Sequence, residues 1–293
     1  MHNSVGQIVS RRWLSLLLLL ASAPVALAQK AAPAPAARPQ APARDVHARV
    51  TETAIDASIK DDTAVDQMLA VYAQKVRALD VVVGKLKGEL RKGGYGAGSL
   101  GNFVADGMRA QGNIKLGKPV DLAIMNGGGL RRNTITEGEL RARDIFELLP
   151  FENALVTLEL TGEQVLKILG VVVSGREAQS GARITYIIKA DKSAALERAT
   201  MVNKEIDPRA TYTVVTIDYI VNVGGDRYAV LREGKNLRPL GITLRDAMMD
   251  YVKAETAAGR NIKPNLDGRF SLDRANSVLT GEAPPKSSQN RLR

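Results

Sequence analysis

The sequence predicts an α+β domain with mixed sheets, and three observations carry this prediction. Apolar residues make up 45% of the 293 residues, which is enough to build a sizeable core. In the first half of the chain, segments with helical spacing of apolar residues alternate with short apolar segments typical of strands. In the second half several strand-like segments follow one another, which argues against a strict winding of alternating strands and helices.

The two ends of the chain differ from the rest in composition. Residues 1–28 have the pattern of a secretory signal peptide, with Arg11 and Arg12 as its positive region, an apolar run from Trp13 to Leu20, and Ala26-Leu27-Ala28 as its cleavage site. We expect cleavage there and a location in the periplasm, without a stable membrane anchor. The alternative is an uncleaved anchor helix, but the apolar run is shorter than the ~20 residues of a membrane span. Arg11 and Arg12 also resemble a twin-arginine export signal.

Two further segments near the ends of the chain contain few large apolar residues that a core could bury. Residues 29–45 form an Ala/Pro-rich linker, and residues 281–293 contain two prolines and several polar residues. Such compositions favour an extended, solvated chain, so we predict a tether and a disordered tail. The folded domain is therefore expected within residues 46–280.

Within this domain, each element follows from apolar spacing and from end signals. A helix is predicted to begin at Asp62 or Thr63, because a capping side chain precedes apolar residues at steps of three and four. Three consecutive valines then predict a strand that continues to Leu90. The remaining elements are, in chain order, a helix over 99–111, strands over 121–126 and 154–160, a helix over 162–173, strands over 182–189, 199–202 and 212–221, a helix over 244–258 and a strand over 269–272.

Residue counts exclude several classes of function. The chain has no cysteine, which rules out disulfides, thiolate metal sites and cysteine nucleophiles. Its net charge is +10, but the basic residues are spread out and do not alternate with aromatic ones, so we expect no nucleic-acid partner. The only histidines are His2 and His47, so neither a two-metal phosphatase centre nor a Ser-His-Asp triad is expected. No carboxylate pair is marked out by its context, and we predict no catalytic residue and no metal ligand.

One glycine-rich segment matches the spacing of a dinucleotide-binding fingerprint. It is Gly96-Ala97-Gly98-Ser99-Leu100-Gly101, at the start of a predicted helix. The fingerprint needs a strand that ends at its first glycine and an acidic residue at the end of the next strand. Here Lys92-Gly93-Gly94-Tyr95 intervenes, and Asp121 begins its strand. We therefore interpret these glycines as a flexible entry to the helix.

Three other segments place a turn beside a strand together with residues suited to a ligand. In Asn126–Arg131, three glycines and an arginine follow a buried strand; glycine lets a backbone approach a ligand closely, and arginine offers a fork of donors. In Leu149–Asn153, a proline holds an aromatic and an amide residue at the mouth of a strand. Asn222–Tyr228 is another glycine turn. Each alone is also compatible with an ordinary turn.

In their order and spacing, these segments resemble the C-terminal domain of the secreted 5′-nucleotidase family, which includes bacterial UDP-sugar hydrolases. The resemblance covers roughly residues 80 to 275. Its matching text is Gly101–Arg109 (GNFVADGMR), Asn126–Arg131 (NGGGLR), Glu137–Leu140 (EGEL), Leu149–Asn153 (LPFEN), Leu160–Gln164 (LTGEQ) and Gly224–Tyr228 (GGDRY).

The resemblance implies a layered α/β/β/α fold with mixed sheets and a domain that holds the nucleoside. In the family a preceding metallophosphatase domain cleaves the phosphate ester, so divalent metals would belong only to a separate catalytic partner, and no cofactor is expected in this chain. By matched position, Phe151 would stack on the base, Asn153 and Asp226 would hydrogen-bond the base or ribose, and Arg131 would bind the charged end. Gly181 would lie against the base.

Two departures from the family pattern concern the ligand site. The second stacking aromatic of the family lies six residues before the residue that matches Asp226, where this chain has Ile220. Tyr219 is one step away, and we predict that it binds the substrate in place of that aromatic. If this segment is a strand, neighbouring side chains point to opposite faces of the sheet, so Tyr219 and Ile220 would face opposite ways. The family also has basic residues just before the helix that begins near Ser99, whereas here Arg91 and Lys92 lie earlier.

Three hypotheses about function follow. The first is a periplasmic domain of nucleotide catabolism that binds nucleosides or nucleotides and has no hydrolytic centre of its own. The second is a true nucleotidase that is assembled with a separate metallophosphatase chain. The third is a structural or interaction domain whose pocket has decayed, as the missing aromatic and basic residues suggest.

Overall fold

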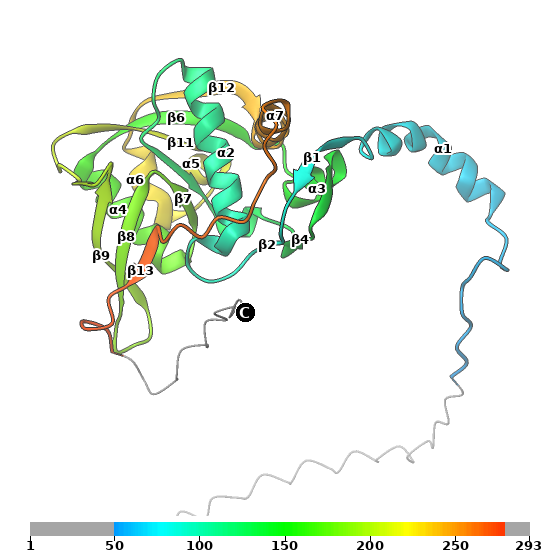
Figure 1. Cartoon of the computed structure of the whole chain (residues 1–293), viewed down its shortest axis with the longest axis horizontal. Helices are drawn as coiled ribbons and strands as arrows, with labels where there is room; N and C mark the ends of the chain where they lie inside the picture. The colour runs from blue at the N-terminus through cyan, green and yellow to red at the C-terminus, as the bar shows by residue number, and fades with distance from the viewer. Residues whose placement is uncertain (1–49, 279–293) are drawn as a thin grey trace, which may run out of the picture. The chain divides into compact units, whose positions relative to one another are not determined.

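A computed structural model of the chain describes residues 50–278 (Figure 1). The predicted signal peptide, the linker over 29–45 and the tail over 281–293 lie outside the described residues. From Asp61 onward the described residues belong to one compact unit. Residues 50–60 contain no helix or strand.

The described residues form seven α-helices, three 3₁₀ helices and thirteen strands. The helices are α1 (Thr63–Ala78), η1 (Tyr95–Ala97), α2 (Gly98–Leu116), η2 (Gly127–Gly129), α3 (Ala142–Leu148), α4 (Gly162–Gly175), α5 (Asp218–Asn222), η3 (Asp226–Tyr228), α6 (Ala229–Arg232) and α7 (Leu244–Ala257). The strands are β1 (Val82–Leu86), β2 (Leu90–Arg91), β3 (Leu122–Met125), β4 (Thr134–Ile135), β5 (Gly138–Arg141), β6 (Ala154–Thr161), β7 (Ala178–Ser180), β8 (Ala182–Ile188), β9 (Ala194–Met201), β10 (Lys204–Glu205), β11 (Thr211–Ile217), β12 (Lys235–Thr243) and β13 (Phe270–Leu272).

The strands form two larger sheets, and both are mixed. The five-stranded sheet has the order β12-β6-β11-β3-β7, in which β11 and β3 run parallel and every other pair is antiparallel. The four-stranded sheet has the order β10-β9-β8-β13, in which only β8 and β13 are parallel. The pairs β1–β5 and β2–β4 form two small antiparallel sheets. The predicted α+β class with mixed sheets is confirmed.

Two long helices pack on the sheets: α2 on the five-stranded sheet, and α4 on strands of both larger sheets. Helix α2 packs on β3, β7 and α7, and helix α4 contacts β6 and β9 (Figure 1). Strand β3 is buried along its whole length, so its four apolar residues need no polar face. Helix α4 begins where the sequence predicts, because Thr161 and Gln164 form a capping box with each other's backbone amides.

A buried ion cluster attaches the last strand to the rest of the fold. The side chain of Arg269 is only 8% exposed and donates to both carboxylate oxygens of Asp106, at 2.8 and 3.0 Å. It also donates to both oxygens of Asp267 and to the carbonyl of Gln179. Burial alone would lower the pKa of Arg269, but its hydrogen bonds to Asp106 and Asp267 raise it overall. The guanidinium therefore stays charged and joins the segment before β13 to α2 and β7.

Two predicted strands end earlier than expected. The strand predicted over 81–90 is interrupted at Gly88, which has φ +93°, and becomes β1 and β2 in different small sheets. The strand predicted over 212–221 ends at Ile217, where α5 begins. The carboxylate of Asp218 accepts hydrogen bonds from the backbone amides of Tyr219 (2.8 Å) and Ala154 (3.1 Å). An acidic residue in the first turn favours a helix start, which the strand pattern does not reveal.

The glycine-rich segment before α2 is packed against the protein itself. Gly96 and Gly98 have positive φ angles, and a Cβ at Gly96 would overlap the ring of Phe270. A Cβ at Gly101 would overlap the carbonyl oxygen of Gly96. The segment is thus a tight entry to α2, in contrast to the flexible entry that we expected.

Helix α1 forms as predicted, with the carboxylate of Asp62 accepting from the amides of Ala64 and Val65. None of its residues is buried, and its apolar side chains Met68 and Tyr72 are 62% and 59% exposed. Within residues 50–278, no helix has the length and apolar character that crossing a membrane would require.

Candidate functional site

One cavity collects most of the residues that the sequence marks for ligand binding. It has a volume of about 300 Å³. Four of the six predicted site residues line it: Arg131, Phe151, Asn153 and Tyr219. The remaining lining residues are Asn126, Gly128 and Gly129.

The glycine run forms one wall of this cavity. Strand β3 ends at Met125, and η2 then turns the chain, with the amide of Gly129 donating to the carbonyl of Asn126 at 3.0 Å. A Cβ at Gly129 would overlap the side chain of Met125 and lie 3.1 Å from Asn126 Oδ1. A side chain at this position would therefore push the end of the Met125 side chain aside, next to the wall of the cavity.

Arg131 leaves the same turn and reaches the aromatic part of the cavity. Its backbone amide donates to the carbonyl of Leu148 at 2.9 Å, which fixes its backbone against the end of α3. Its guanidinium lies 5.8 Å from the ring centroid of Phe151, within the range of a cation–π contact. It also makes one long hydrogen bond, of 3.5 Å, to the carbonyl of Gly128. The side chain is exposed and weakly held, so it can turn toward an anionic group.

Two half-exposed aromatic rings line the cavity. Phe151 is 47% exposed and precedes β6, and Tyr219 is 46% exposed and lies in α5. Asp218 links the two segments through its bond to the amide of Ala154. The backbone carbonyl of Asn153 accepts from the amide of Leu244 at 2.8 Å, which ties this segment to the start of α7. Exposure at this level shows that Phe151 is not a core residue.

The helical conformation of α5 changes the argument about the second aromatic. Successive residues of an α-helix differ by about 100° in direction, whereas those of a strand point to opposite faces. Ile220 is fully buried, and Tyr219 lines the cavity. Tyr219 therefore stands beside Phe151 in the same site, even though it is displaced by one position from the family pattern.

Asp226 and Gly181 are not among the residues that line this cavity. The side chain of Asp226 is fully exposed at the start of η3, and its one ion pair is a 3.8 Å contact with Arg232. Gly181 lies at a separate cavity of about 380 Å³ that also contains Asp106 and Arg269. A Cβ at Gly181 would overlap the carbonyl oxygen of Asp121, so a close approach of two backbone segments explains this glycine.

Asn126 is a site residue to which the sequence assigned no role. Its Oδ1 atom is buried, and among residues 50–278 it has no hydrogen-bond partner. Buried polar atoms are nearly always paired, so this acceptor marks Asn126 as a candidate contact for a ligand donor once its side chain turns toward the cavity. Its position directly before the glycine run is the only sequence signal that could have singled it out.

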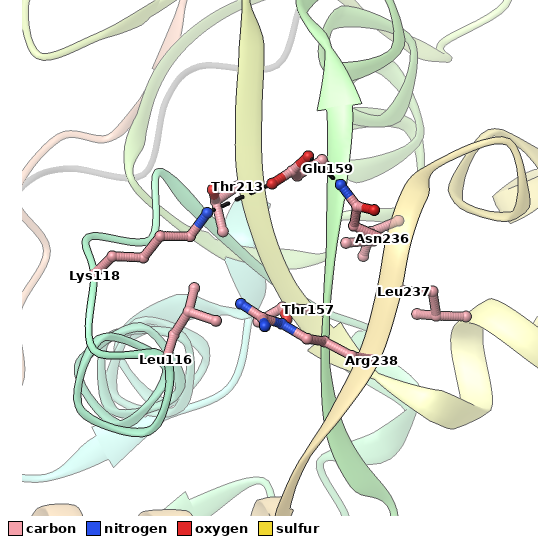
Figure 2. A pocket seen from close by; sticks show the side chains of 9 residues that line it. Leu116, Lys118, Thr157, Glu159, Thr213, Asn236, Leu237 and Arg238 are labelled. Atoms are coloured by element: carbon pink, nitrogen blue, oxygen red, sulfur yellow. Dashed lines mark hydrogen bonds and ion pairs between the residues drawn. The ribbon is translucent and has the colours of Figure 1, made fainter.

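A third cavity, on the five-stranded sheet, has a different character. Figure 2 shows Lys118, Glu159 and Arg238 around a space of about 290 Å³. Glu159 accepts from the Asn236 side chain at 2.7 Å and pairs with Lys118 at 3.5 Å. The hydrogen bond from Asn236 is the main cause of the lowered pKa of Glu159. Aromatic residues are absent from the lining of this charged cavity.

No group of three or more His, Cys, Asp or Glu side chains within residues 50–278 is arranged to hold a metal ion.

Comparison with known sequences identifies the family. Residues 80–233 match the family described as 5′-nucleotidase, C-terminal domain. The chain belongs to this family. Two relatives are the protein UshA of Yersinia enterocolitica, 29% identical over 76% of this chain and 38% of that protein, and the endonuclease YhcR of Bacillus subtilis, 29% identical over 75% and 18%. This member of the 5′-nucleotidase C-terminal domain family thus spans less than two fifths of either relative, and the match is to the C-terminal part of UshA.

The fold agrees with solved structures of the same family. The 5′-nucleotidase precursor of Thermus thermophilus superposes with a TM-score of 0.59 and 29% identity, over 72% of this chain and 43% of that one. The NAD nucleotidase of Haemophilus influenzae superposes with a TM-score of 0.54 at 20% identity and supports the fold alone.

Proposed function

We propose that this 5′-nucleotidase C-terminal domain binds a nucleoside or nucleotide in the cavity of Phe151 and Tyr219, in the periplasm, as part of nucleotide catabolism. The observation that carries the proposal is the presence of two half-exposed aromatic rings in one cavity with an arginine and two asparagines. Aromatic side chains stack on bases of any identity. A volume of about 300 Å³ lies at the lower end of the range for small-molecule sites, which suits a nucleoside.

The polar groups of the cavity match the rest of such a ligand. Asparagine side chains can donate to and accept from the edge of a base, and Asn126 Oδ1 is an acceptor without a partner in the described part of the chain. Arg131 offers a planar set of donors for a phosphate group. The ligand thus has an apolar ring face, hydrogen-bonding edges and an optional anionic end.

The domain has no hydrolytic centre of its own in this proposal. A metallophosphatase on a separate chain would supply the divalent metals, and the two would form a nucleotidase only together. Proteins named 5′-nucleotidase are about three times as long as the part that matches this chain. The third hypothesis, a decayed pocket, loses one of its two arguments because Tyr219 lines the cavity, and the argument from the missing basic residues remains.

Calorimetric titration of the purified chain with adenosine, AMP and UDP-glucose tests the proposal. We expect saturable binding of at least one of them, and weaker binding when Phe151 is replaced by alanine. Binding of none of the three would overturn the proposed function. Assays of phosphate release from AMP with added divalent metals should give no activity, and metal-dependent release that survives repurification would contradict the absence of a hydrolytic centre.

A further inference from the structure

Glu177 is a buried acidic residue in the short connection between α4 and β7. Its side chain is only 6% exposed. A buried charge is costly unless several partners compensate it. Here both carboxylate oxygens are engaged. Oε1 accepts from the Tyr228 hydroxyl at 2.8 Å and pairs with Arg227 Nη2 at 3.1 Å, and Oε2 accepts from the backbone amide of Gly127.

These partners come from two separate segments around the ligand cavity. Gly127 begins η2, whose Gly128 and Gly129 line the cavity. Arg227 and Tyr228 belong to η3, which follows α5 and its Tyr219. Glu177 itself does not line the cavity. One carboxylate therefore bridges the glycine wall and the segment that follows the second aromatic.

The surrounding sequence makes room for this bridge. A Cβ at Gly175 would overlap Arg227 Nη2, so a glycine is needed there for the arginine to reach Glu177. Burial of the Tyr228 hydroxyl and the nearby Glu177 charge raise the pKa of Tyr228, which therefore remains a protonated donor. The contact is charge-assisted at both oxygens, and such bonds are among the strongest in proteins.

We propose that Glu177 is a positioning residue for the ligand cavity, which holds the Gly127–Gly129 turn against the Gly224–Tyr228 turn without touching the ligand. This proposal rests on the proposed function. Three donors converge on the carboxylate, and only a carboxylate offers acceptors on both of its atoms. A glutamine would keep one acceptor and turn an amide donor toward Gly127, Tyr228 or Arg227, so at least one of these groups would lose its partner.

The test compares Glu177→Gln with a matched control, Asp106→Asn, which weakens the buried Arg269 cluster at a different place. Each variant removes the negative charge from an ion pair in which one side chain is buried, so both should lower the melting temperature. With ¹⁵N-glycine labelling, the free Glu177→Gln protein should show an upfield shift of the Gly127 amide proton and faster exchange at Gly127–Gly129. Asp106→Asn should leave these signals unchanged. Affinity for adenosine and AMP should fall about tenfold in Glu177→Gln only.

Three results would overturn the positioning role. They are an unchanged Gly127 amide in Glu177→Gln, unchanged affinity in that variant, or equal losses of affinity in both variants, which would indicate a general effect of stability. If Glu177→Gln does not fold, Tyr228→Phe removes one donor while it keeps the ring. It should weaken ligand binding by a smaller factor, and unchanged affinity together with unchanged glycine amides would reject the proposal. If the wild-type chain binds no ligand, the proposed function fails, and the free-state glycine signals still decide whether Glu177 fixes the turn.

Discussion

The aromatic cavity and the charged cavity have nearly the same volume, about 300 and 290 Å³, and opposite chemistry. Phe151 and Tyr219 present ring faces in the first, with polar groups that converge on them from separate turns. Lys118, Glu159 and Asn236 satisfy one another in the second (Figure 2). A carboxylate that two neighbours already bind has little to offer a ligand, whereas two exposed rings and an acceptor without a partner in residues 50–278 have much more. Volume alone does not separate the two.

The largest expected effect is on phosphate recognition. Arg131→Ala should weaken AMP binding by about 1.5 to 3 kcal/mol, the usual contribution of a hydrogen bond to a charged group, and should affect adenosine much less. Titration of the variant with both ligands measures this. Equal losses for AMP and adenosine would show that Arg131 does not bind the phosphate. Its role would then be limited to its contact with the ring of Phe151.

Phe151→Ala should weaken adenosine and AMP alike, by about 1 to 3 kcal/mol, because stacking depends on the base and not on the phosphate. The variant should still melt cooperatively, since the ring is already 47% exposed. Calorimetry for binding and thermal unfolding for stability check the two parts. If the variant does not fold, Phe151 has a structural role and its effect on binding is not due to stacking.

Tyr219→Ala should cost about 1 kcal/mol of binding free energy, at the lower end for a stacking residue, because α5 has only five residues and can adjust. Tyr219→Phe keeps the ring and should bind adenosine as the wild type does. This pair of variants decides whether the ring or the hydroxyl matters. Full affinity in Tyr219→Ala would show that Phe151 alone stacks on the base.

The smallest effect is expected in the charged cavity. Arg238→Ala removes a cation that reaches from the edge strand β12, and it should leave the Kd for adenosine and AMP unchanged (Figure 2). Lysine and arginine on an edge strand are common because they discourage pairing with other chains. A loss of AMP affinity as large as that of Arg131→Ala would show that the two cavities have been assigned the wrong way round.

The sequence could predict those parts of the site that are defined by residues close together in the chain. The glycine run, the Pro150–Phe151 segment and the second glycine turn were recognisable because each is short and adjoins a strand. The helical start at Asp218 was not, because its carboxylate acts partly on Ala154, which is 64 residues away. The same limit applies to Glu177, whose partners Gly127 and Tyr228 are 50 and 51 residues distant. Glu177 is one of 31 Asp and Glu residues, and nothing in the neighbouring sequence distinguishes it as a residue that bridges two turns.

The Arg269 cluster has a consequence for the order in which the chain can fold. Asp106 and Arg269 are 163 residues apart, and the arginine also binds the carbonyl of Gln179. Contacts between such distant residues form late, since the intervening chain must first be ordered and closed into a loop. While a ribosome is still making the segment before β13, Asp106 has no guanidinium to pair with and the parallel strand next to β8 is missing. The domain therefore completes its fold only after almost its entire length has been synthesised.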